Sequence, residues 1–231
     1  GDGNAEGVQY FMKGSLSHLT SFPAQSVNYS ESHDDYCWID RITENPDHRG
    51  DHPTDNDTAR THLMFALLFA SIGIPQFAAG QDFIRSKQGM HNTYLRGDIN
   101  ALDYNKIKDH ATTHEYVKKW IHYRLSEKGK IFRHYQAPGD QFFRFFEAGT
   151  PAVAALLNAD YSRDDPRHIF AINPQTDPVT LQMDELHAEH WKCLADTWHW
   201  NIQGLDSHAF QNHEIHLPAL SCGLWVQKSI S

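Results

Sequence analysis

The pattern of apolar residues changes near residue 130, and this change constrains the fold more than any other feature of the chain. Before it, short strand-like segments alternate with longer helical ones, which is typical of βαβ units on a parallel sheet. After it, short β-rich segments are separated by turn-forming residues, which is typical of an antiparallel sandwich. The sequence therefore predicts an α/β part over residues 1–130 and an all-β part over residues 131–231.

The α/β part holds two predicted strands with a helix between them. We expect the strands over residues 26–31 and 74–79 and the helix over residues 57–73. The apolar run LMFALLFASIGI (63–74) is shorter than the roughly 20 residues that a bilayer span needs, so it predicts a buried helix. Two parallel strands cannot pair without such a crossover between them.

These elements are too few for a closed parallel barrel. Thr54, Asp55 or Asp57 is suited to cap the first helix, and a second helix is predicted over residues 113–128. A closed parallel barrel needs eight strands, each followed by a helix. We therefore expect residues 1–130 to be the C-terminal segment of a (β/α)8 barrel whose other strands lie upstream.

The all-β part contains several predicted strands and four tryptophans. The strands are expected in the segments QFFRFFE, AVAALLN, HIFAIN, VTLQM, EIHLP and GLWVQK. We expect the tryptophans to belong mainly to the core, with a starch-binding patch as the alternative; they are Trp191, Trp198, Trp200 and Trp225.

Charge and cysteine content argue against several classes of function. The formal net charge is −9 with neutral histidines, and no basic run is longer than Lys118-Lys119, so a surface that neutralises nucleic-acid phosphates is not expected. Cys37, Cys193 and Cys222 are far apart and predict neither a disulfide framework nor a CxxC metal site. We expect no cofactor, no metal, no nucleic-acid partner and no membrane partner.

The N-terminus does not reveal where the protein resides. The chain starts with GDGNAEGVQYF, which has neither an initiator methionine nor the basic and apolar regions of a signal peptide. We expect the natural N-terminus to lie upstream, where it would carry any targeting signal. The scattered cysteines slightly favour a reducing compartment, but the cytoplasm and secretion from a bacterium both stay open.

The first predicted strand ends in a cluster of polar and aromatic side chains. The stretch SVNYSESHDDYCWID places His33, Asp34 and Asp35 directly after the strand, with Tyr36 and Trp38 just beyond. Catalytic residues of parallel barrels lie at the carboxyl ends of the strands, and carboxylates beside rings suit a sugar. An ordinary polar loop is the alternative.

Three motifs, in order along the chain, resemble glycoside hydrolase family 13, the α-amylase family. VNYSESHDD (27–35) is similar to the region where the seventh barrel strand of that family ends in a His-Asp pair, and GIPQFAAGQDF (73–83) is similar to its eighth strand. NTYLRGDINALDY (92–104) resembles a run found in the pullulanase and glycogen-debranching branch. The resemblance extends over essentially the whole chain, as strands 7 and 8 of the barrel with their helices, followed by the β-sandwich domain.

The resemblance implies a retaining glycosidase that acts on α-glucans. The nucleophilic aspartate and the general acid of the family belong to barrel strands that would lie before this chain begins. Asp34 corresponds to the third acid of the family, which hydrogen-bonds the hydroxyls of the sugar being cleaved, and His33 would donate to a neighbouring hydroxyl. Two departures are Asp35, where the family usually has asparagine, and Gln81-Asp82, where Glu-Glu is common.

The resemblance also implies a set of substrate-binding side chains, because the loop after the eighth strand borders the substrate cleft in the resembling enzymes. A hydrogen-bonded loop that packs on the barrel is an equal alternative for that loop, and core packing is favoured for the rings after the first strand. The predicted substrate-binding residues are Asp35, Tyr36, Trp38, Asn92, Tyr94, Asp98 and Asn100.

The sequence thus predicts the C-terminal portion of a hydrolase of pullulan, glycogen or starch-like α-glucans that is inactive by itself. An α-glucan oligosaccharide or polysaccharide is the expected partner. Because two parallel strands leave sheet edges and apolar helix faces uncovered, we also expect self-association or docking on the N-terminal part. A non-catalytic carbohydrate-binding or structural module is the alternative.

Two other clusters are expected to be solvent-exposed. The acids over residues 40–57 lack the D-x-[DN]-x-[DN]-G spacing of calcium loops, so a solvated loop is predicted. The chain has 17 histidines, and those near its C-terminal end are scattered over predicted strands and turns, which predicts surface positions without zinc ligation.

Overall fold

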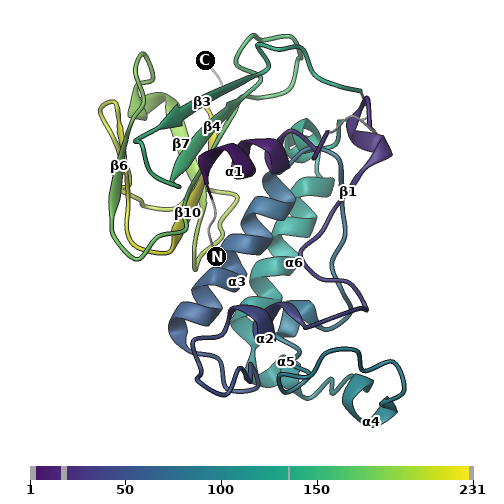
Figure 1. Cartoon of the computed structure of the whole chain (residues 1–231). Helices are drawn as coiled ribbons and strands as arrows, with labels where there is room; N and C mark the ends of the chain where they lie inside the picture. The colour runs from purple at the N-terminus through teal and green to yellow at the C-terminus, as the bar shows by residue number, and fades with distance from the viewer. Residues whose placement is uncertain (1–3, 17–19, 135, 229–231) are drawn as a thin grey trace.

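The chain folds into three layers: helices cover one face of a five-stranded sheet, and a three-stranded sheet covers the other face (Figure 1). The structure is a computed structural model that describes residues 4–16, 20–134 and 136–228. The fold therefore combines helices with antiparallel sheets, as the sequence predicts.

The elements alternate in the first part and are mainly strands in the second. The α-helices are α1 (Ala5–Met12), α2 (Trp38–Ile42), α3 (Asp55–Ala70), α4 (Gly97–Asn100), α5 (Lys106–Asp109) and α6 (Ala111–Leu125). The 3-10 helices are η1 (Pro23–Gln25), η2 (Gln81–Phe83), η3 (Lys128–Phe132) and η4 (Ala188–His190). The strands are β1 (Val27–Asn28), β2 (Ile74–Pro75), β3 (Phe143–Glu147), β4 (Val153–Leu157), β5 (His168–Asn173), β6 (Val179–Gln182), β7 (Trp191–Asp196), β8 (Phe210–Gln211), β9 (Glu214–Leu217) and β10 (Ser221–Gln227).

Helix α3 begins at a capping box, which selects one of the caps that the sequence allows. The Thr54 side chain accepts a hydrogen bond from the Asp57 amide, while the Asp57 carboxylate accepts one from the Thr54 amide. These reciprocal bonds satisfy amide groups that the first turn of a helix cannot pair. From this start α3 runs beside α6, and both helices pack against the five-stranded sheet (Figure 1).

Strands β1 and β2 pair in parallel, as predicted, and α3 lies between them in the chain. The paired residues are Val27 with Ile74 and Asn28 with Pro75. Both strands are much shorter than predicted, with two residues each. The predicted lengths were therefore wrong. One reason is that Pro75 has no amide hydrogen to donate to the ladder between the two strands.

The β-rich part forms two antiparallel sheets that face each other. The five-stranded sheet has the order β3-β4-β5-β10-β7, and the three-stranded sheet has the order β6-β9-β8. Apolar side chains from both sheets meet in one buried cluster, to which Leu156 and Ile169 contribute from one side and Leu181 and Ile215 from the other. The antiparallel prediction is confirmed, although β7 and the two-residue β8 were not predicted as strands.

The five-stranded sheet is buried on both faces and connects the two predicted parts through one core. Every residue of β4 is buried. On the helix side, the Trp120 ring of α6 lies edge-on to the Phe170 ring of β5 at a centroid distance of 6.4 Å, and to the Trp200 ring at 5.3 Å. One apolar cluster therefore extends across residue 130. The division into residues 1–130 and 131–231 stays a prediction.

A buried histidine links α6 to the sheet. His168 of β5 is fully buried, with Nδ1 at 2.8 Å from the Pro166 carbonyl oxygen and Nε2 at 2.6 Å from the Tyr123 hydroxyl. Because a carbonyl can only accept, Nδ1 carries the proton and Nε2 accepts from the tyrosine. Burial lowers the pKa of His168 to about 4.

We expect this histidine to make the fold sensitive to acid. Its pKa is about 6.5 in the unfolded chain and lower in the folded one, so its contribution is fully present above pH 6.5 and is lost as pH falls toward 4. Between pH 7.5 and pH 5 the loss is about 2 kcal/mol in the free energy of unfolding. Urea unfolding of the wild type and of a His168 variant at both pH values measures this loss. His168→Phe should reduce the difference by about this amount, whereas substitution of the exposed His122 by glutamine should leave it unchanged.

Candidate active site at the end of strand β1

The chain that follows β1 forms a loop whose base is closed by a carboxylate. The backbone amide of Trp38 donates to Glu31 Oε2 at 2.7 Å, so the residues between them form a closed loop. The side chain of Glu31 is buried, and Cys37 belongs to a small apolar cluster with Ile39 and Ile84. The ends of the loop are therefore anchored in the interior, while its middle faces outward.

His33 and Asp34 lie at the outward-facing middle of this loop. Their side chains are 92% and 80% exposed, and His33 Nε2 lies 3.5 Å from Asp34 Oδ1. The Asp34 amide donates to Ser32 Oγ at 3.3 Å. Both functional groups are thus free to meet a ligand, and a carboxylate beside an imidazole can accept and donate hydrogen bonds to neighbouring hydroxyls.

Asp35 adopts a left-handed conformation and turns toward helix α2. Its φ is 61°, a value that aspartate and asparagine tolerate better than most residues. Its Oδ2 lies 2.7 Å from Arg41 Nη2. The carboxylate of Asp35 is thus paired with Arg41, whereas that of Asp34 lies beside His33.

The two predicted rings have different neighbours. Tyr36 contacts the His91 ring, with centroids 4.9 Å apart, and so joins the loop to the segment that carries Asn92. Trp38 begins α2, packs against the main apolar core and donates from Nε1 to Thr61 Oγ1 of α3 at 3.2 Å.

The predicted residues of the segment 92–100 fall into two groups. Asn92 and Tyr94 are exposed, Tyr94 at 83%. Asn100 bonds back to Thr93, accepting from its hydroxyl at 2.8 Å and donating to its carbonyl, so it shapes the loop. Asp98 forms two hydrogen bonds with Arg96, at 2.9 and 2.7 Å, and these bonds lower the pKa of Asp98 to about 2.

A cavity of about 270 Å³ lies between the segments 83–88 and 98–110. Asp98 lines it together with Arg85, Lys87, Lys106 and His110. His33 and Asp34 do not line this cavity. Of the predicted residues, the structure brings the loop 32–37 beside the segment 87–92 through Tyr36, while Asp98 faces a separate hollow.

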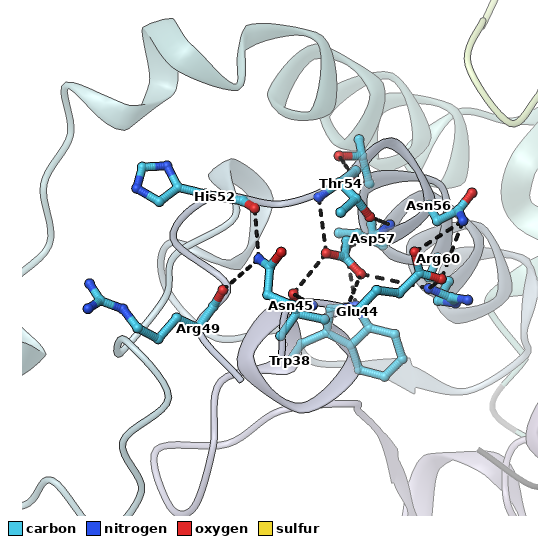
Figure 2. A network of polar contacts seen from close by, with 12 residues as sticks. Trp38, Glu44, Asn45, Arg49, His52, Thr54, Asn56, Asp57 and Arg60 are labelled. Carbon is cyan, nitrogen blue, oxygen red and sulfur yellow. Dashed lines mark hydrogen bonds and ion pairs between the residues drawn. The ribbon is translucent and has the colours of Figure 1, made fainter. Parts of the chain in front are cut away.

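The acidic segment 40–57 agrees only in part with the expected solvated loop: Glu44, Asp47 and Asp55 are exposed, whereas one acid in helix α2 and one in helix α3 are buried. Asp40 and Asp57 are 2% and 0% exposed. Figure 2 shows the Asp57 carboxylate at the centre of a network, where it accepts from the Thr43 hydroxyl and from the Glu44 and Thr54 amides at 2.9, 2.9 and 3.0 Å. These carboxylates are acceptors for backbone and hydroxyl groups, so their lone pairs are engaged within the chain.

Further along this network, surface side chains join the start of α3 to the segment that precedes it. Glu44 lies 2.7 Å from Arg60 Nη1 and accepts from the Asn56 amide group (Figure 2). Asn45 donates to the carbonyl oxygens of Arg49 and His52, at 2.9 Å each. The segment before α3 is therefore ordered by its own hydrogen bonds, and it is joined to α2 by the Gly50 amide, which donates to the Asp40 carboxylate at 2.8 Å.

The part of the chain that the structure describes holds neither a metal-binding cluster nor a helix that could span a membrane. Within residues 4–16, 20–134 and 136–228, no group of three His, Cys, Asp or Glu side chains is arranged to hold a metal ion. None of the helices in those same ranges is long and apolar enough to cross a bilayer.

Comparison with known proteins points to one kind of protein. No family model matches the sequence. The pullulanase of Bacillus subtilis is 30% identical over 151 residues, which are 57% of this chain and 20% of that protein. The solved pullulanase from Bacillus acidopullulyticus has a TM-score of 0.80 and 27% identity, and the match covers 98% of this chain and 27% of that one.

A third relative extends the fold match. The pullulanase from Paenibacillus barengoltzii, solved as a complex with maltohexaose and α-cyclodextrin, has a TM-score of 0.77 and 24% identity over 98% of this chain and 34% of its own. The chain thus spans between 20% and 34% of the length of these relatives. Sequence and fold together show that the chain is homologous to pullulanases and corresponds to the C-terminal portion of this type of glycoside hydrolase family 13 protein.

Proposed function

We propose that this chain is the part of a pullulanase-type α-glucan hydrolase that supplies Asp34 and His33 to the active site. The observation that carries the proposal is the exposed His33–Asp34 pair in the loop that follows the parallel strand β1, in a chain homologous to pullulanases. The relative from Paenibacillus barengoltzii was solved with maltohexaose, and an α-glucan is therefore the ligand that we assign to this chain.

The chemistry assigns Asp34 a role in the transition state. A retaining glycosidase uses two carboxylates roughly 5–5.5 Å apart, one as nucleophile and one as acid/base. In our proposal both belong to upstream strands, and Asp34 hydrogen-bonds the hydroxyls of the sugar being cleaved. Its negative charge then faces the developing oxocarbenium ion, so it binds the transition state more tightly than the substrate. His33 donates to a neighbouring hydroxyl. Asn92 and Tyr94, with the adjacent Tyr36, are assigned to substrate binding.

We further propose that β1 and β2 are strands 7 and 8 of a (β/α)8 barrel. Two exposed apolar residues on these strands support this, since Val27 and Ile74 are each 44% exposed. A mainly apolar groove of about 350 Å³ lies next to them, lined by Phe77 of the β2 segment and by Ile121 and Leu125 of α6. The upstream strands would cover this face, and self-association of the isolated chain stays a prediction.

The isolated chain should release no reducing sugar from pullulan, because the proposed nucleophile and acid are supplied from outside it. A reducing-sugar assay measures this, with the pullulanase from Bacillus acidopullulyticus at the same molar concentration as the positive control. Release that scales with the concentration of the chain and disappears in Asp34→Asn would contradict the proposal. The complementary test is to sequence the gene upstream of the Gly1 codon, where we expect an aspartate ending one strand and a glutamate ending the next.

The alternative of a non-catalytic glucan-binding module has limited support. Trp191, Trp200 and Trp225 are buried, so they cannot offer a ring face to a sugar. Trp198 is 43% exposed and its ring lies edge-on to His62 at 5.1 Å. Binding of maltooligosaccharides that is lost in Trp198→Ala but kept in Asp34→Asn would favour this module.

A further inference from the structure

A buried lysine reaches the loop that carries Asp34 from inside the protein. Lys87 is only 2% exposed, although lysine is rarely buried without a partner. Its Nζ donates to two carbonyl oxygens, those of His33 and Asp35, at 3.2 Å each. Among the residues that the structure describes, no carboxylate forms an ion pair with Lys87. The two peptide carbonyls that flank Asp34 are thus the partners of this ammonium group.

The backbone of Lys87 is itself held firmly. Asp40, which is buried in α2, accepts from the Lys87 amide at 2.6 Å through Oδ2. Its other oxygen accepts from the Ser86 hydroxyl at 2.6 Å and from the Gly50 amide at 2.8 Å. One carboxylate therefore joins three segments that are distant in the sequence, and it fixes the point from which the lysine side chain starts.

Glu31 supplies the opposite charge at the base of the same loop. Its Oε2 accepts from the Trp38 amide, while its buried Oε1 has no hydrogen-bond partner within the described part of the chain. Burial raises the pKa of Glu31, whereas the Trp38 amide and the charges of Arg85 and Lys87 act in the opposite direction. Lys87 and Glu31 therefore lie on the inner side of a loop whose outer side presents His33 and Asp34.

We propose that Lys87 is a positioning residue for Asp34: its ammonium group binds the carbonyls on both sides of the aspartate and holds the carboxylate in the orientation that the sugar requires. This inference rests on the proposed function of Asp34. The exposed side chains of His33 and Asp34 contact mainly each other, so the position of the backbone around Asp34 limits where its carboxylate can point. A catalytic group that is misplaced by about 1 Å can lose about 10²-fold in rate.

The test uses the full-length protein that contains this chain, with pullulan as substrate. Lys87→Met should lower kcat about 10–100-fold and change KM by less than about 3-fold, because the ammonium acts through a group that serves the transition state. In an Asp34→Asn background, Lys87→Met should cause little further loss, because there is no carboxylate left to position. Lys87→Arg, which keeps the charge, should recover part of the activity.

Several controls separate positioning from folding. Lys118→Met removes an exposed lysine that pairs with Glu115 on α6, and its kinetics should match the wild type. If Lys87→Met does not fold, Lys87→Gln keeps a donor at a similar reach and takes its place in the same cycle. Equal losses from the Lys87 change with and without Asp34 would overturn the positioning role, as would an unchanged kcat. Full activity of Asp34→Asn alone would instead refute the proposed function.

Discussion

Replacing Asp34 by asparagine in the full-length protein should lower turnover on pullulan by about 10²–10³-fold. The substitution keeps the size and the hydrogen-bonding reach of the side chain but removes its negative charge. Since that charge is assigned to the oxocarbenium-like transition state, kcat should fall far more than affinity for substrate. Initial rates over a range of pullulan concentrations separate kcat from KM.

The neighbouring aspartate provides a matched control. Asp35→Asn makes the same chemical change one residue later, where the carboxylate is paired with Arg41 at 2.7 Å. Asparagine also tolerates the left-handed backbone at this position. Its turnover should stay within a few-fold of the wild type. If Asp34→Asn kept near-wild-type turnover, or if Asp35→Asn caused the larger loss, Asp34 would not be the third acid.

The long periodic elements could be read from the sequence, because local rules determine them. Helix α3 has a strong apolar run after a capping residue, and it spans Asp55–Ala70 where residues 57–73 were predicted. Strand β5 coincides with the predicted segment HIFAIN. In contrast, β7 was missed: its sequence WKCLAD contains a lysine and an aspartate, and only its place beside β10 makes it a buried strand.

The supports of the candidate site could not be predicted in the same way. His33 and Asp34 stood out because two polar residues followed a strand and matched a motif. Lys87 carried no such signal, since its partners are carbonyl oxygens 54 and 52 residues earlier in the chain. Contacts of this kind depend on how segments meet after folding, and sequence spacing contains little information about them.

A buried arginine makes contacts of the same kind elsewhere in the fold. Arg124 lies in the last turn of α6 and is 5% exposed. Burial, with the nearby Arg133 charge as a smaller cause, lowers the pKa of Arg124 to about 9, so its guanidinium stays charged at neutral pH. It donates to four carbonyl oxygens at 2.6 to 2.7 Å, and these belong to Phe69, Ser71, Gly73 and Phe132.

We expect Arg124→Met to lower the free energy of unfolding by about 3–5 kcal/mol, because a buried carbonyl left without a donor costs about 1–3 kcal/mol. Methionine keeps much of the packing volume, so the loss reports mainly on hydrogen bonds. Urea unfolding followed by tryptophan fluorescence measures it. Arg144→Met, which removes an exposed arginine paired with Glu185, should change stability by less than about 0.5 kcal/mol.

Arg124→Lys distinguishes the charge from the geometry of the contact. A lysine keeps the positive charge at the C-terminal end of α3, which favours a cation, but it lacks the planar set of five donors. If geometry dominates, the loss in the free energy of unfolding caused by Arg124→Lys should be at least about half of the loss caused by Arg124→Met. Wild-type stability in Arg124→Lys would show that charge alone suffices. The same guanidinium binds Ser71 at the end of α3 and Gly73, the residue before β2. Since β2 pairs with β1, the strand before the loop of Asp34, the comparison also tests whether charge or geometry holds β2 in place.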